Sequence, residues 1–147
     1  MKIRFNALYA RFEIKQEIDT SPAVPPIALN VWEELPFNCA PTDAIGDFVY
    51  IDPINADTVI KNTDNTPNQP TIGIIIAKPT TTTCRVALNA EITGFSGLTQ
   101  GQQVFLSTGG GLTSVPPATA YVQMLGYALS PTRIKLEPYI LRARRAS

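Results

Sequence analysis

The sequence predicts an all-β fold, a small antiparallel β-barrel or sandwich of about eight strands with an extended N-terminal arm. From residue 43 onward, short runs of β-branched and aromatic residues alternate with turns of Gly, Pro, Asn, Ser and Thr, at spacings near ten residues. Before that point, prolines repeatedly interrupt apolar sequence, which forbids a long helix and favours an extended path. We therefore expect an arm over residues 1–42, a β-domain over residues 43–140 and a basic tail over residues 141–147.

The arm is apolar, aromatic and broken by prolines, so it is poorly suited to pack on itself. Near its start, apolar residues such as Ile3 and Ala7 alternate with polar ones, a pattern typical of a strand. We expect this segment to dock on a neighbouring molecule, since some 36 extended residues reach on the order of 120 Å. The residues expected to lead the contact are Arg4, Phe5, Tyr9, Phe12 and Trp32. The alternative is that the segment forms the first strands and a covering loop of the same domain.

The first half of the β-domain is read from hydrophobicity and turn residues. Strands are expected near residues 46–51, 57–61 and 72–77, and the last of these (IGIIIA) is hydrophobic enough to be a central strand. The polar segment 61–70 (KNTDNTPNQP) predicts an exposed loop. Four threonines at residues 80–83 predict an exposed edge or loop.

The next strand shows a strict alternation. Cys84, Val86, Leu88 and Ala90 are expected to face inward, and the residues between them, including Ala87, to face outward. Three further strands are expected near residues 103–107, 121–129 and 132–136. They are separated by a triple-glycine turn at residues 109–111 and a Pro-Pro break at residues 116–117.

Composition limits the chemistry open to this chain. It has no histidine, so Ser-His-Asp, Cys-His and zinc-histidine sites are excluded. Twelve acids balance twelve bases, which gives no overall field to hold nucleic acid or an anionic membrane. No run of about 18 apolar residues and no signal peptide are visible, so we expect synthesis in the cytoplasm. We expect no catalytic residue, no metal site and no cofactor.

Residue groups that invite a functional interpretation have simpler ones. Four aspartates flank the first two strands of the domain, but no Asp-x-Asp-x-Asp-Gly loop is present, and such residues commonly cap turns. Glu33 and Glu34 beside Trp32 resemble a sugar-binding corner only weakly. The three glycines lack the Lys-Ser/Thr of a phosphate loop. Cys39 and Cys84 can pair or remain separate thiols, and the strand pattern favours a buried free thiol at Cys84.

Several different short motifs follow one another along the β-domain. Gly-Asp-x-Val-Tyr opens a strand at residues 46–50, Ile-Gly-Ile follows at residues 72–74, and Gly-Leu-Thr-x-Gly-x-x-Val-Phe-Leu-Ser spans residues 97–107. Gly-Gly-Leu-Thr, Pro-Pro and Val-Gln-x-x-Gly-x-Ala-Leu-Ser, the last at residues 122–130, complete the order. This order, over residues 44–138, resembles a module of auxiliary virion proteins of tailed bacteriophages.

The resemblance implies a virion structural protein, such as a capsid decoration or cement protein, a head fibre or the base of a tail fibre. We expect a homotrimer that binds the major capsid protein or another virion component through the arm. Arg142, Arg144 and Arg145 form the one basic cluster, for which an acidic protein surface is a better partner than nucleic acid. The alternatives are a host-surface carbohydrate-binding module of a tail fibre and a small enzyme that uses carboxylates alone.

Overall fold

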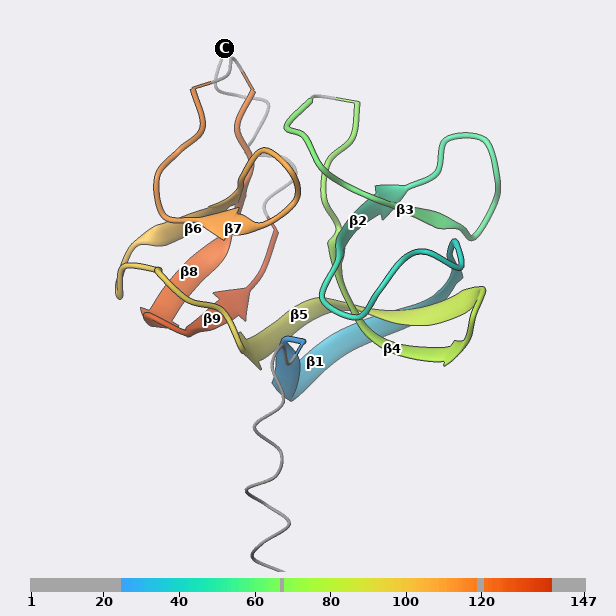
Figure 1. Ribbon diagram of the computed structural model, residues 1–147, viewed down its shortest axis with the longest axis horizontal. Helices are drawn as coiled ribbons and strands as arrows, with labels where there is room; N and C mark the ends of the chain where they lie inside the picture. The colour runs from blue at the N-terminus through green and yellow to red at the C-terminus, as the bar shows by residue number, and fades with distance from the viewer. Residues whose placement is uncertain (1–24, 67, 119–120, 139–147) are drawn as a thin grey trace, which may run out of the picture.

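The protein folds into one curled antiparallel sheet, so the predicted all-β class is confirmed (Figure 1). The computed structural model describes residues 25–66, 68–118 and 121–138. Eight of its strands follow the path β3-β2-β4-β5-β9-β8-β6-β7, and β1 pairs with β5 beside that path. The strands are β1 (Ile27–Asn38), β2 (Phe48–Ile51), β3 (Val59–Lys61), β4 (Gly73–Thr80), β5 (Thr83–Thr93), β6 (Gln103–Leu106), β7 (Leu112–Thr113), β8 (Met124–Ser130) and β9 (Arg133–Leu136).

The long strand β5 joins the two halves of the sheet. Its N-terminal part pairs with β4 and its C-terminal part with β9, while β1 runs antiparallel along its whole length on the other side. Figure 1 shows β2 and β3 above β4 on one side, β6 to β9 on the other side, and β5 with β1 running between the two sides at the bottom. The result is an open half-barrel whose floor is the pair β1 and β5.

The strands expected from residue 46 onward are all present, with the short β7 added after the triple-glycine turn. The stretch 72–77 lies in β4, between β2 and β5, so its predicted central position is confirmed. Of the four threonines, Thr81 and Thr82 form the turn between β4 and β5, and Thr80 and Thr83 pair with each other at the ends of these strands. Within the segment expected to be an arm, residues 27–38 form β1 of the domain's own sheet, whereas residues 1–24 lie outside the described part.

A bulge in β5 overturns the simple alternation predicted for this strand. Ala87 was expected to face outward, but it is fully buried. Opposite two consecutive residues of β1, β5 advances from Ala87 to Asn89, so Leu88 is an extra residue. As a result Ala87 and Ala90, three apart, both pack in the larger core cluster, while Val86 packs in the smaller one. One strand therefore serves two cores.

Two core clusters lie on opposite faces of β2 and β4. Neighbouring residues separate between them: Phe48 and Ile74 belong to the larger cluster, and Val49 and Ile75 to the smaller. All four side chains are almost completely buried. Burial of each such side chain contributes roughly 1.5–3 kcal/mol relative to exposure. Both faces of these strands are covered, which explains why residues 72–77 are apolar without alternation.

A buried polar network connects the two halves above the floor. The Gln123 side chain accepts a hydrogen bond from the Thr71 N–H (2.7 Å) and donates one to the Thr71 carbonyl (2.9 Å). The Asn62 amide donates to the Thr71 hydroxyl (2.9 Å). Asn62 was expected in an exposed loop, but it is 1% exposed. The prediction for Asn62 was wrong, because the loop turns this side chain inward, where it satisfies a backbone carbonyl next to β4.

Candidate interaction surface

The structure describes one of the eight residues predicted to bind partners. Trp32 lies in β1 and is 60% exposed. The other seven lie outside the described residues: Arg4, Phe5, Tyr9, Phe12, Arg142, Arg144 and Arg145. Their roles remain predictions, so the site is built from β1 and its surroundings.

β1 is an edge strand with an apolar, uncovered surface. Among the residues in the structure, half of the large apolar side chains that are exposed belong to this one strand. They are Ile27, Leu29, Val31, Trp32 and Leu35. Sequence reasoning selected only the tryptophan, because the signal for the other four is their place at an edge, which composition does not reveal.

Two of these side chains owe their exposure to bulges. Relative to β5, Leu29 and Trp32 are extra residues in β1. The exposed residues also lie on both faces of the strand. Val31 is opposite the core residue Ala90, whereas the Trp32 ring lies under the ammonium of Lys135 on the outer face. An apolar edge that is open on both faces is unusual for a protein that functions alone.

Lys135 holds the indole ring of Trp32 in a defined place. Its Nζ lies 5.0 Å from the ring centroid, a cation–π contact. The same Nζ donates to Asn89 Oδ1 (2.9 Å) and approaches Glu137 Oε1 at 3.3 Å. Tyr127, the pairing partner of Lys135 in β8, is 43% exposed. The outer face therefore carries two exposed aromatic side chains around a fixed lysine.

One ion pair and one side-chain hydrogen bond join β1 to β5. Arg85 Nε lies 2.9 Å from Glu34 Oε1, and the Asn30 amide donates to Glu91 Oε1 at 2.9 Å. These side chains are partly exposed, so each pair contributes at most about 1 kcal/mol. Their effect is to fix the register of β1 on β5 and so the position of its exposed side chains.

The entry of the chain into β1 is fixed by two glycines. A Cβ on Gly46 would lie 2.7 Å from Pro26 Cδ, and one on Gly94 would lie 2.8 Å from Pro26 Cα. Both glycines have positive φ angles, +102° and +114°, which side-chain-bearing residues rarely adopt. Pro26 is thus held between two turns immediately before β1.

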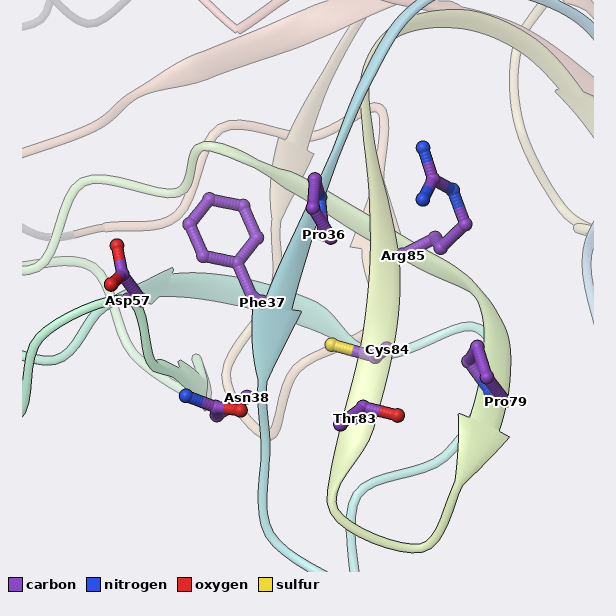
Figure 2. Close-up of a pocket in the computed structure, with 8 residues that line it drawn as sticks. All are labelled: Pro36, Phe37, Asn38, Asp57, Pro79, Thr83, Cys84 and Arg85. Atoms are coloured by element: carbon purple, nitrogen blue, oxygen red, sulfur yellow. The ribbon is translucent and has the colours of Figure 1, made fainter.

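An open pocket of about 440 Å³ lies where β1 ends beside the β4–β5 hairpin (Figure 2). Phe37 and Pro79 provide apolar walls, and Asp57 and Arg85 provide charge. Figure 2 shows the Cys84 sulfur directed toward β1, away from Arg85 on the other side of the strand. The pocket is lined by Pro36, Phe37 and Asn38, the last residues of β1, and so adjoins the exposed surface of that strand.

The two cysteines are free, buried thiols, as the strand pattern favoured for Cys84. Cys39 follows β1, and its N–H donates to the Thr82 carbonyl at 2.9 Å, which places it diagonally across from Cys84. Burial raises the pKa of the Cys84 thiol, and its hydrogen bond with Cys39 raises it further. The Cys84 thiol therefore stays protonated at neutral pH, which disfavours a nucleophilic role for it.

The aspartates beside the first strands organise turns. Asp43 accepts from the Ala40 N–H (2.8 Å) and Asp47 from the Ala44 N–H (2.9 Å). Hydrogen bonds hold the pKa of Asp52 below its usual value. The bond from the Asn55 side chain has the largest effect, and the bond from the Ile54 N–H has the next largest. In the described ranges no three His, Cys, Asp or Glu side chains come together as metal ligands do.

No family model and no curated protein matches the chain. No helix in residues 25–66, 68–118 or 121–138 has the length and apolar character needed to cross a membrane.

Proposed function

We propose that this protein is a non-enzymatic structural component of a bacteriophage virion, a capsid decoration or cement protein or the base of a fibre. In this role it binds neighbouring subunits through β1 and the segment that precedes it. The observation that carries the proposal is the exposed apolar edge strand, with Trp32 60% exposed, on a sheet whose core is otherwise well covered. The expected partners are the major capsid protein or another virion component, and further copies of the chain in a trimer.

Two features support assembly as the role of this surface. The exposed side chains are large and apolar, and each contributes roughly 1.5–3 kcal/mol when buried, before the cost of ordering the partners. The Arg85–Glu34 ion pair and the Pro26 contacts already hold β1 in place, so little order remains to be imposed on binding. The order of strand and turn motifs that resembles auxiliary virion proteins adds a reason to place the assembly in a phage particle.

The direct test is the composition of purified particles. We expect mass spectrometry of virions produced from the genome that encodes this chain to find it in many copies per particle. A variant without residues 2–24 keeps the whole of β1 and should be lost from the particles. A deletion that also removed β1 would uncover β5 and is unsuitable, because β1 pairs along that strand. Detection of the chain in infected cells but not in particles would contradict the proposal.

A host-surface carbohydrate-binding function is the second candidate, and one observation favours it. Trp32 and Tyr127 are both exposed on the side of Lys135, where planar rings and polar groups suit a sugar ring. A glycan array probed with the wild-type chain and with Trp32→Ala decides the matter. Binding that the substitution abolishes would support this function, and an array without specific signals would dismiss it.

A further inference from the structure

We propose that residues 3–9 of one copy of this chain add as an antiparallel strand to the free edge of β1, residues 27–35, in a second copy. The inference rests on the proposed function in treating the N-terminal segment as the element of assembly, and it names the partner of that segment as the chain itself. Two observations carry it: the edge of β1 is apolar and uncovered, and residues 3–9 have the sequence pattern of a strand.

The acceptor is the outer edge of β1. In the part of the chain that the structure describes, the named strands leave this edge unpaired, and it meets other backbone only at its last residue, where the Asn38 N–H donates to the Asp57 carbonyl. Its exposed side chains lie on both faces, so a flat partner would cover only one set. An added strand places alternate side chains beside both sets.

The length and composition of the acceptor define where the added strand ends. Pro36 has no N–H to offer a partner, so regular pairing stops at Leu35. The bulges at Leu29 and Trp32 disfavour a long, regular strand from an unrelated protein. Residues 27–35 also lack the lysines that commonly protect sheet edges. A short strand with a matching pattern is the best occupant.

The donor has the required pattern and charge. Residues 3–9 (IRFNALY) place Ile3, Phe5, Ala7 and Tyr9 on one face, and the segment is basic, with Lys2 and Arg4 near its start. The acidic residues of the edge, Glu33 and Glu34, stand near its end. Antiparallel addition brings the basic start of the donor to the acidic end of the acceptor, whereas parallel addition separates them.

The position of the prolines favours a second copy over the same chain as acceptor. Pro22, Pro25 and Pro26 precede β1 and favour an extended path, which opposes the reversal needed to fold residues 3–9 onto their own edge. The Gly46 and Gly94 contacts fix where this path begins. Residues 10–24, when extended, span about 50 Å, which is enough to reach a neighbouring copy.

The test uses two full-length variants, each missing one half of the contact. Phe5→Asp with Tyr9→Asp disables the donor, and Leu29→Asp with Leu35→Asp disables the acceptor. Analytical ultracentrifugation should show the wild type as an oligomer, each variant alone as a monomer and their equimolar mixture as a one-to-one dimer. Trp32 is the only tryptophan, so its fluorescence emission should move to shorter wavelength in the mixture as the edge is covered.

A matched control is Ile54→Asp, which introduces the same charge at an apolar side chain that is 86% exposed outside β1 and should leave the oligomer intact. Circular dichroism checks that each variant is folded. A mixture that stays monomeric would overturn exchange between copies, as would an oligomer that survives either double substitution. Because the assay uses purified chain alone, its failure leaves incorporation into particles to be judged separately, and the reverse also holds.

Discussion

Gln123 shows how a single side chain can hold the half-barrel together. It lies just before β8, is 2% exposed and forms two hydrogen bonds with the backbone of Thr71, which lies just before β4. These bonds join segments from opposite sides of the curl. Without them, a buried N–H and a buried carbonyl would have no partner, which is more costly than the bonds themselves are stabilising.

We expect Gln123→Leu to lower the free energy of unfolding by about 2–4 kcal/mol, because two buried backbone groups of Thr71 lose their partners. Urea denaturation followed by circular dichroism measures the change. Gln102→Leu, the same substitution at an exposed glutamine, is the control and should have little effect. Equal stability of the two variants would show that the network contributes little.

The buried Cys84 thiol gives the fold a dependence on alkaline pH. Burial raises the pKa of Cys84 above its ordinary value of 9.0, so the folded state keeps a proton that the unfolded chain releases. The stabilisation is full below pH 9 and is lost as pH rises above it toward the folded pKa. We expect the urea midpoint to fall more steeply between pH 8 and 10 in the wild type than in Cys84→Ala. Parallel profiles would contradict this origin.

At the scale of single elements, β1 depends on how its first residues are held. Gly94→Ala would place a methyl group 2.8 Å from Pro26 Cα at a φ of +114°. We expect a loss of about 1–3 kcal/mol in unfolding free energy and faster hydrogen exchange in β1. Gly101→Ala shares the positive φ (+86°) but meets no atom within 4 Å, so it isolates the backbone cost. Equal exchange rates in the two variants would mean that Pro26 does not secure β1.

The same scale shows what sequence reasoning can reach. Turn residues and hydrophobic runs were enough to locate the strands after residue 46, because both signals are local. The bulge at Leu88 was not predictable, since it depends on the register of β1 on β5. Because of this extra residue, the side chains expected to share one inward face lie on two faces of the strand. Val86 packs in the smaller core cluster and Ala90 in the larger one.

The candidate surface was predictable only in part, for a related reason. A tryptophan in an apolar, proline-broken segment predicted a contact site; Trp32 is exposed, and its role as a contact stays a prediction. The four aliphatic residues that extend this surface look like core residues in sequence. Ile27 and its neighbours are exposed because β1 is the last strand on its side of β5, which is a property of topology.

At the scale of the whole molecule, the proposed role in assembly offers a single explanation for the low charge and the apolar edge. Charged residues are 16% of the chain, and the two signs balance, so long-range attraction does not select its partners. The surface best suited to association is the uncovered side of β1, whose side chains are large, apolar and held in place. Under the proposed function, we expect such a chain to stay bound to neighbouring subunits.

The measurement that tests this account most directly is native mass spectrometry of the full chain across a concentration series. If β1 serves assembly, we expect a stable oligomer that persists on dilution into the micromolar range. The expected state is a trimer. A chain that remains monomeric at every concentration would contradict the claim that its exposed edge serves assembly with its own kind.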